Sequence, residues 1–152
     1  MALLLNVLWL IFGGGLILGL SWLVMALLFA VSIVGLPWAR AALNMSFLAF
    51  APFGRVPISR LVLNEGRSDL GTGPVGMIGN IVWFVLAGFW LALAHVAVGV
   101  ANCITIIGIP FGLANFRMAS AALFPVGMAI VPKAVAEEAT RRAAIRSLDG
   151  LA

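Results

Sequence analysis

Two long stretches of the chain carry almost no charge, and this feature constrains the fold more than any other. Residues 1–39 contain no ionisable side chain, and residues 70–116 contain only His95 and Cys103. A helix needs about 20 apolar residues to cross the hydrocarbon core of a bilayer, and both stretches are longer. With 64% hydrophobic and 9% charged residues, the chain could not hide its apolar surface in a water-soluble fold. The sequence therefore predicts a multi-pass membrane protein.

The chain also repeats itself. FAVSIVGLPWARAALN (residues 29–44) is echoed by NCITIIGIPFGLANFR (residues 102–117), each with a hydroxyl residue followed by Gly-Leu/Ile-Pro and an aromatic residue. Internal repeats in membrane proteins build pseudo-symmetric bundles, so we predict two tandem units. The positions that recur in order are Asn6 with Asn80, Trp9 with Trp83, Gly14 with Gly88, Gly35 with Gly108, Pro37 with Pro110, Pro52 with Pro125 and Gly54 with Gly127.

Each unit is predicted to be a helical hairpin, which makes the fold an all-α membrane protein with about four transmembrane segments. The first arms are the apolar segments 3–34 and 77–107, which are too long for an upright crossing. We expect a bend or break at residues 13–15 and at Gly88, because glycines are weak helix formers.

The second arms start at the Gly-x-Pro motifs. Proline restricts the residue before it and suits the first turn of a new helix. The second arm of the second unit is expected to continue past Pro125 to Val131, just long enough to cross. A re-entrant second arm remains open as the alternative. The residues of this helix-break motif are Gly35, Pro37, Gly108, Pro110 and Gly112.

The charged residues indicate the orientation. Arginines and the lysine gather in the middle connection and in the tail, which places both, and both termini, in the cytoplasm. The predicted divisions are a first membrane unit (1–55), a cytoplasmic connection (56–76), a second membrane unit (77–131) and a cytoplasmic tail helix (132–152). This charge bias explains the net charge of +4 without nucleic acid. The expected partners are the bilayer, further copies of the chain, and anionic lipid at the basic connection and tail.

A few polar side chains stand out within the apolar segments of the second unit. His95, Asn102, Asn115 and Arg117 form the candidate polar membrane site, because an ionisable group at membrane depth is costly unless it is paired or functional. The structural alternatives are a neutral imidazole bonded to a neighbouring helix, and polar groups that cap the turns. Arg40 and Asn44 are loose analogues in the first unit.

Other motifs indicate structure rather than chemistry. Gly15 and Gly19 form G-x-x-x-G, which lets helix backbones approach closely. GTGPVG (residues 71–76) fits a dinucleotide motif by letter only, since a proline interrupts it and no acidic residue follows at the required distance. Trp9, Trp38 and Trp83 are expected at the membrane interface. We expect no catalytic residue, no metal and no cofactor, because neither unit holds an acid–base pair or metal cluster.

The segment HVAVGVANCITIIGIPFGLANF, with Pro125-Val126-Gly127 downstream, resembles the YccF family of bacterial inner-membrane proteins. In that family the stretch reads close to H-I-A-x-G followed by Q-C-I-S-I-I-G-I-P-x-G-I-A-N-F. Asn102 and Thr105 stand where the family has Gln and Ser. The resemblance implies an inner-membrane location and tandem copies of one small domain. It implies no established activity, so it assigns no catalytic residue.

The sequence favours a small homo-oligomeric pore or transport component, lined by polar residues near the helix breaks. The alternative is a non-transporting scaffold or accessory subunit. An enzyme is the least favoured class.

Overall fold

The computed structural model describes residues 1–32 and 35–149. The predicted end of the first apolar segment at Val34 and the last three residues of the predicted tail lie outside this part. In chain order the elements are α1 (Ala2–Phe12), α2 (Gly15–Val31), α3 (Leu36–Phe50), β1 (Arg55–Ser59), α4 (Arg60–Leu63), α5 (Pro74–Trp83), the π-helical turn η2 (Phe84–Gly88), α6 (Phe89–Cys103), α7 (Ile109–Leu123), β2 (Met128–Pro132) and α8 (Lys133–Asp149).

The two first arms bend in different ways. α1 and α2 meet at 79°, which confirms the predicted break. The break falls at Gly14, whose φ of 78° is a left-handed conformation that glycine adopts without strain. In the second half, α5 and α6 form one continuous helix, Pro74–Cys103, through the π-helical turn that ends at Gly88. Extra residues in a π turn redirect a helix without breaking its hydrogen bonding.

The Gly-x-Pro motifs start new helices, as predicted. α3 begins at Leu36 and α7 at Ile109, each with its proline in the first turn. The preceding hydroxyl residue has the same role in both turns. The Ser32 Oγ accepts a hydrogen bond from the Gly35 N–H at 3.1 Å, and the Thr105 Oγ1 accepts one from the Gly108 N–H at 3.0 Å.

The core lies within and between the two hairpins, where α2 packs against α3 and α6 packs against α7. Trp9 and Trp83 belong to this core, so the prediction that they anchor the membrane interface is wrong. Their exposed fractions are 0% and 5%. The Trp9 Nε1 donates to the carbonyl of Ala49 at 2.6 Å, and the Trp83 Nε1 donates to the carbonyl of Ala122 at 2.8 Å.

A two-stranded antiparallel ribbon corrects the all-α prediction. α7 ends at Leu123, and the segment predicted to remain helical to Val131 forms β2 instead. Gly54 and Gly127, with φ of 87° and 88°, lead into β1 and β2. The helix must end before such a residue, because the left-handed conformation interrupts its hydrogen bonding.

The ribbon is nearly symmetric about its centre. It pairs Arg55 with Pro132 and Ser59 with Met128, and its central pair is Pro57 with Ile130. The shift that aligns Gly54 with Gly127 in sequence also aligns Pro57 with Ile130. An antiparallel pair has a local two-fold axis perpendicular to its plane. Here that axis passes between two positions that correspond in the sequence repeat.

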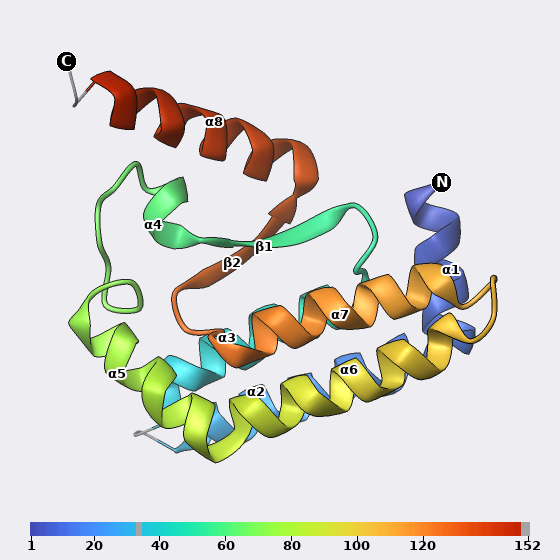
Figure 1. Cartoon of the computed structure of the whole chain (residues 1–152). Helices are drawn as coiled ribbons and strands as arrows, with labels where there is room; N and C mark the ends of the chain where they lie inside the picture. Colours follow the sequence, from blue (N-terminus) through green and yellow to red (C-terminus); the bar gives the residue numbers. More distant parts are fainter. Residues whose placement is uncertain (33–34, 150–152) are drawn as a thin grey trace.

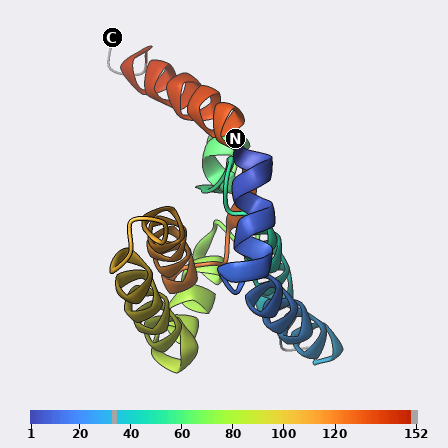
Figure 2. The ribbon, with the colours of Figure 1, turned by 90° about the vertical axis from the view of Figure 1, so that its right-hand side faces the viewer.

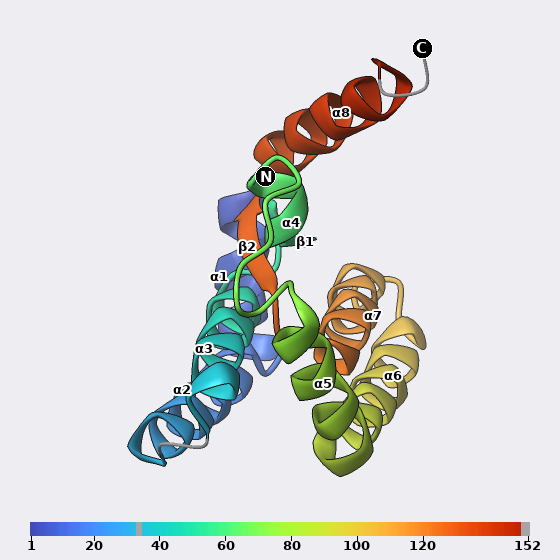
Figure 3. The same cartoon turned by 90° about the vertical axis from the view of Figure 1, so that its left-hand side faces the viewer.

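The ribbon separates a charged layer from an apolar one. Figure 1 shows β1 and β2 with α4 and α8 on one side and the helical hairpins on the other. Seen from the two sides, the α2–α3 pair and the α6–α7 pair diverge as they leave the ribbon (Figures 2 and 3). α8 carries the ion pairs Glu138–Arg142 at 2.7 Å and Glu138–Arg141 at 2.9 Å.

The hairpins expose many large apolar side chains, as expected of a chain whose solvent is lipid. Ile104, Ile106 and Ile107 in the α6–α7 turn are 82–87% exposed. By length and composition, one described helix can cross a membrane, Pro74–Cys103, or two if the bent α1–α2 pair counts as one. Four crossings therefore stay a prediction from the sequence.

Candidate functional site

Two asparagines hold the first helix of each half to the chain that leaves the second helix. The Asn6 side chain donates to the carbonyl of Phe53 at 3.1 Å and accepts from its N–H at 3.0 Å. Asn80 makes the same pair of bonds with Val126, at 2.9 and 3.0 Å. The sequence aligned these asparagines but did not reveal this role, because the contacts join residues far apart in the chain.

Two members of the predicted polar site, His95 and Asn115, lie together. The His95 Nδ1 is 3.1 Å from the Asn115 Oδ1, and the Asn115 Nδ2 donates to the carbonyl of Phe111 at 3.1 Å. Their exposed fractions are 5% and 0%. A polar side chain buried among apolar ones must be hydrogen-bonded, and both the oxygen and the nitrogen of the Asn115 amide have a partner here.

His95 and Asn115 line a cavity of about 450 Å³ between the two hairpins. α2 supplies one wall and α6 the other, and the lining is almost entirely apolar, with three tryptophans. Ser21 also lines the cavity, but its Oγ already donates to the carbonyl of Ile17 at 2.8 Å. Such a cavity has the size and character of a small-molecule site.

The other two members of the predicted site lie elsewhere. Arg117 is on the ribbon side of α7, where its Nη1 donates to the carbonyl of Pro52 at 2.9 Å and to that of Arg55 at 3.4 Å. The half-buried Asn102 is close to the α6–α7 turn, where its backbone carbonyl accepts from the Thr105 N–H. Neither residue lines the cavity that contains His95.

The glycines of the helix-break motif allow close approach of backbones. A side chain at Gly35 or Gly108 would collide with the preceding turn, including the hydroxyl group of Ser32 or Thr105. A side chain at Gly112 would meet the Cys103 sulfur and the carbonyl of Gly99. These positions therefore serve the turns and the α6–α7 contact.

Gly15 and Gly19 make room for aromatic rings of the same chain. A side chain at Gly15 would collide with the Trp9 indole, and one at Gly19 would collide with the Phe50 ring. The buried Ser46 Oγ donates to the carbonyl of Gly19 at 2.9 Å. In this structure the G-x-x-x-G face packs within the chain.

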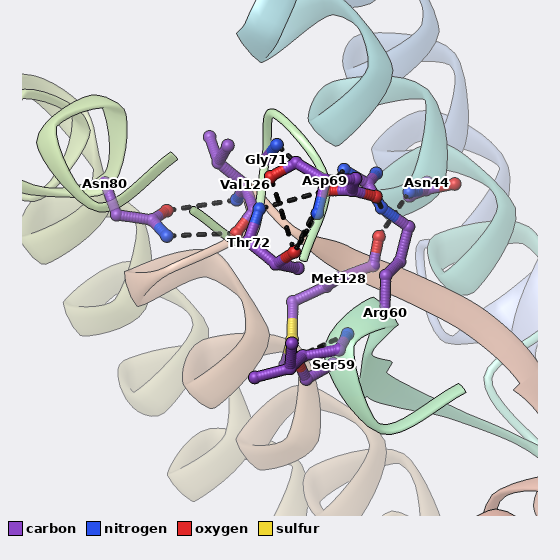
Figure 4. Close-up of polar contacts among 10 residues, drawn as sticks. Asn44, Ser59, Arg60, Asp69, Gly71, Thr72, Asn80, Val126 and Met128 are labelled. Atoms are coloured by element: carbon purple, nitrogen blue, oxygen red, sulfur yellow. Dashed lines mark hydrogen bonds and ion pairs between the residues drawn. The ribbon is translucent and has the colours of Figure 1, made fainter. Parts of the chain in front are cut away.

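The connection contains an ion pair that the sequence did not reveal. The Arg60 Nε and Nη2 donate to the two carboxylate oxygens of Asp69 at 2.7 and 3.0 Å. The Asp69 Oδ1 also accepts from the N–H groups of Gly71 and Thr72, both at 2.9 Å (Figure 4). The Arg60 guanidinium, followed by the Thr72 and Gly71 donors, holds the pKa of Asp69 well below its usual range. GTGPVG thus forms the turn that leads into α5, which begins at Pro74.

Within residues 1–32 and 35–149 no group of three or more His, Cys, Asp or Glu side chains could hold a metal ion. Cys103, the one cysteine of the sequence, is half-buried at the end of α6. The described part of the chain therefore offers a bonded polar pair that lines an apolar cavity.

Comparison with known proteins agrees with the membrane character of the chain. The model of the YccF family, described as an inner membrane component domain, matches residues 4–55 and 78–128. The chain is 38% identical over 136 residues to the inner membrane protein YccF of Escherichia coli (strain K12), covering 90% of this chain and 92% of the relative. The YccF protein of Shigella flexneri matches to the same extent. No solved structure matches. The family description names a membrane component and no enzyme, and this chain belongs to the YccF family of bacterial inner-membrane proteins.

Proposed function

We propose that this chain is a non-transporting component of the inner membrane, embedded from the cytoplasmic face, that presents the ribbon and α8 to the cytoplasm. The sequence favoured a pore first and an accessory or scaffold subunit second. The geometry supports the second. The observation that carries it is that α3 and α7 each contact the connection, the ribbon or the segment that leads into it at more than one point along the helix.

α3 meets the ribbon side of the molecule at its start, middle and end. Near its start, Arg40 lines one cavity with Arg60 and Gly71 of the connection. In its middle, the Asn44 Nδ2 donates to the carbonyl of Met128 in β2 at 2.9 Å. At its end the chain passes through residues 51–54 into β1. A helix perpendicular to the membrane could touch a surface ribbon at one end only.

α7 has the same relation to the ribbon. Near its start, the Phe111 ring lies 6.2 Å from the ring of Phe53, which precedes β1. In its middle, Arg117 bonds the carbonyls of Pro52 and Arg55. At its end the chain turns into β2. α3 and α7 have 15 residues each, about 22 Å of helix, less than the ~30 Å hydrocarbon core.

The charges support a position of the ribbon at the membrane surface. The Arg60–Asp69 ion pair lies in the connection beside the ribbon, and the charged helix α8 begins at Lys133 directly after β2. Charged groups in the hydrocarbon core are costly. Helices that follow the ribbon therefore lie at the interface. Basic residues favour the cytoplasmic side, where anionic headgroups would meet Arg55 and Arg67.

We also propose that the halves are two copies of one structural unit, related by the two-fold axis of the ribbon. The recurring contacts of Asn6 and Asn80, and those of Trp9 and Trp83, support this relation. In agreement with this axis, α3 contacts α5 in one half, and Phe111 at the start of α7 packs on Trp9 of α1 in the other (Figure 1). Self-association in the membrane remains part of the proposal, through the exposed apolar faces of α2 and α6.

The experiment is side-specific thiol labelling in a Cys103→Ser background. Single cysteines are placed in the α6–α7 turn (Thr105→Cys), the connection (Ser68→Cys) and α8 (Ser147→Cys), and spheroplasts are treated with a membrane-impermeant maleimide. We expect none of the three to react from outside, and Ser68→Cys and Ser147→Cys to react after permeabilisation. Reaction of Thr105→Cys from outside would show that the hairpin crosses and would overturn the proposal.

A pore is the second candidate, because the His95–Asn115 pair is a polar feature deep between the hairpins. Ion and solute flux into liposomes would test it, with His95→Ala and Arg117→Ala as controls. Flux that both substitutions reduce would favour a pore. No flux above that of empty liposomes supports the accessory component.

A further inference from the structure

The cavity between the hairpins is accessible from the lipid. Its walls include Trp22, Phe29, Trp83 and Leu91, while Trp90 at its edge is 63% exposed. It lies between α2 and α6, the helices of each hairpin that are farther from the ribbon (Figure 3). A molecule dissolved in the membrane can therefore enter it without crossing the polar layer.

Among the described residues, the His95–Asn115 pair leaves one ring nitrogen of His95 without a hydrogen-bond partner. The Asn115 amide nitrogen donates to Phe111, which fixes the amide so that its oxygen faces His95. The His95 Nδ1 must then carry the proton that it donates to this oxygen. An imidazolium without a counter-ion would be costly here, so the ring is neutral and its Nε2 is an acceptor.

The His95 side chain lines the cavity, and its Nε2 is the ring nitrogen that does not contact Asn115. Among the described residues it has no hydrogen-bond partner, whereas every fully buried side-chain nitrogen or oxygen has one. The Nε2 therefore retains accessible surface. We take this surface to face the cavity, because His95 lines it. The residue as a whole is only 5% exposed. An acceptor held in this way needs a donor from a ligand.

We propose that the cavity binds a membrane-dissolved lipid alcohol, an apolar molecule whose single hydroxyl donates to the Nε2 of His95. The apolar walls and the volume of about 450 Å³ suit a hydrocarbon chain. A carboxylate would bring a second acceptor against Nε2, and an ammonium would bring an uncompensated charge. Water is a poor occupant, because it needs two to four polar partners and the lining offers few.

Photocrosslinking of the full chain tests this inference directly. The protein is reconstituted in phosphatidylcholine, whose headgroup has no hydroxyl, and labelled with hexadecanol that carries a diazirine on its chain. We expect crosslinks in α2 and α6, and competition by unlabelled hexadecanol about fivefold to tenfold stronger than by its methyl ether or by hexadecanoate.

Variants separate the hydrogen bond from the shape of the cavity. His95→Leu should abolish the preference for the alcohol over the methyl ether, whereas His95→Gln, which keeps an acceptor, should retain part of it. Ala94→Trp fills the cavity and should remove the crosslinks without touching the His95–Asn115 bond. Thermal unfolding of each variant reports folding.

Equal competition by alcohol and ether in the unmodified protein would overturn the inference, as would crosslinks that persist in Ala94→Trp. The proposal goes beyond the accessory role and does not require it, since the cavity is the same whether or not the hairpins cross. Side-specific labelling and photocrosslinking can therefore fail independently.

Discussion

At the scale of single residues, the asparagines at the start of each half connect distant parts of the chain. Asn80→Ala removes both hydrogen bonds between the Asn80 side chain and Val126. The backbone N–H and carbonyl of Val126 then lose these partners. We expect the free energy of unfolding to fall by about 1–3 kcal/mol. Denaturant unfolding in micelles measures it. Asn64→Ala is the control, since Asn64 is exposed; equal losses in both variants would contradict the assigned role.

The Asp69 carboxylate gives the connection a pH dependence of known sign. Because Arg60 lowers its pKa, Asp69 stabilises the folded state above its unfolded pKa of about 3.9 and loses this effect as the pH falls through the folded value. We expect Asp69→Asn to be less stable by about 1 kcal/mol at pH 7, since Asp69 is partly exposed. The difference should persist to pH 5 and shrink at lower pH. Unfolding at several pH values checks this; a constant difference down to pH 2 would contradict it.

At the scale of elements, two glycines at unlike positions should respond oppositely to alanine. Gly14 has a φ of 78°, so alanine there should lower the free energy of unfolding by about 1 kcal/mol. Gly79 lies inside α5 with no atom near the position of an added Cβ. Alanine there should raise the free energy of unfolding by about 0.5–1 kcal/mol. Thermal unfolding in the same detergent compares them. If both variants lost stability, the loss in Gly14→Ala could not be attributed to the left-handed conformation at the break.

The elements also show how far local sequence could predict the fold. The Gly-x-Pro helix starts and the break at Gly14 follow from properties of the residues themselves, and both were predicted. β2 was missed, because MAIVP reads equally well as a buried helix or strand, and its partner β1 is distant in the chain. Pro125 and Gly127 were the available signals against a continuous helix. His95 and Asn115 were identified as candidates, but their pairing depends on how α6 packs on α7.

At the scale of the whole molecule, the sequence could predict membrane insertion but not depth. Uncharged segments indicate lipid as solvent, whereas the embedding that we propose for the hairpins rests on contacts such as Asn44 with β2 and Arg117 with Pro52. Those contacts also satisfy polar side chains that the sequence suggested for a pore. Backbone carbonyls bind the Arg117 guanidinium, which explains why such a costly residue can lie in a mostly apolar helix.

Depth measurement along α3 tests the embedding of the whole molecule. Spin labels at the exposed positions Leu36, Leu43 and Phe47 should report similar depths, because α3 follows the ribbon. If α3 crossed, Leu36 and Phe47 would differ in depth by about 16 Å. Val75 and Phe89 provide the internal control, since α5 descends from the ribbon side and labels there should differ (Figure 1). A steady depth gradient along α3 would contradict this embedding. The ribbon would then have to leave the membrane surface for the hydrocarbon core, where the neighbouring Arg60–Asp69 ion pair could not be hydrated.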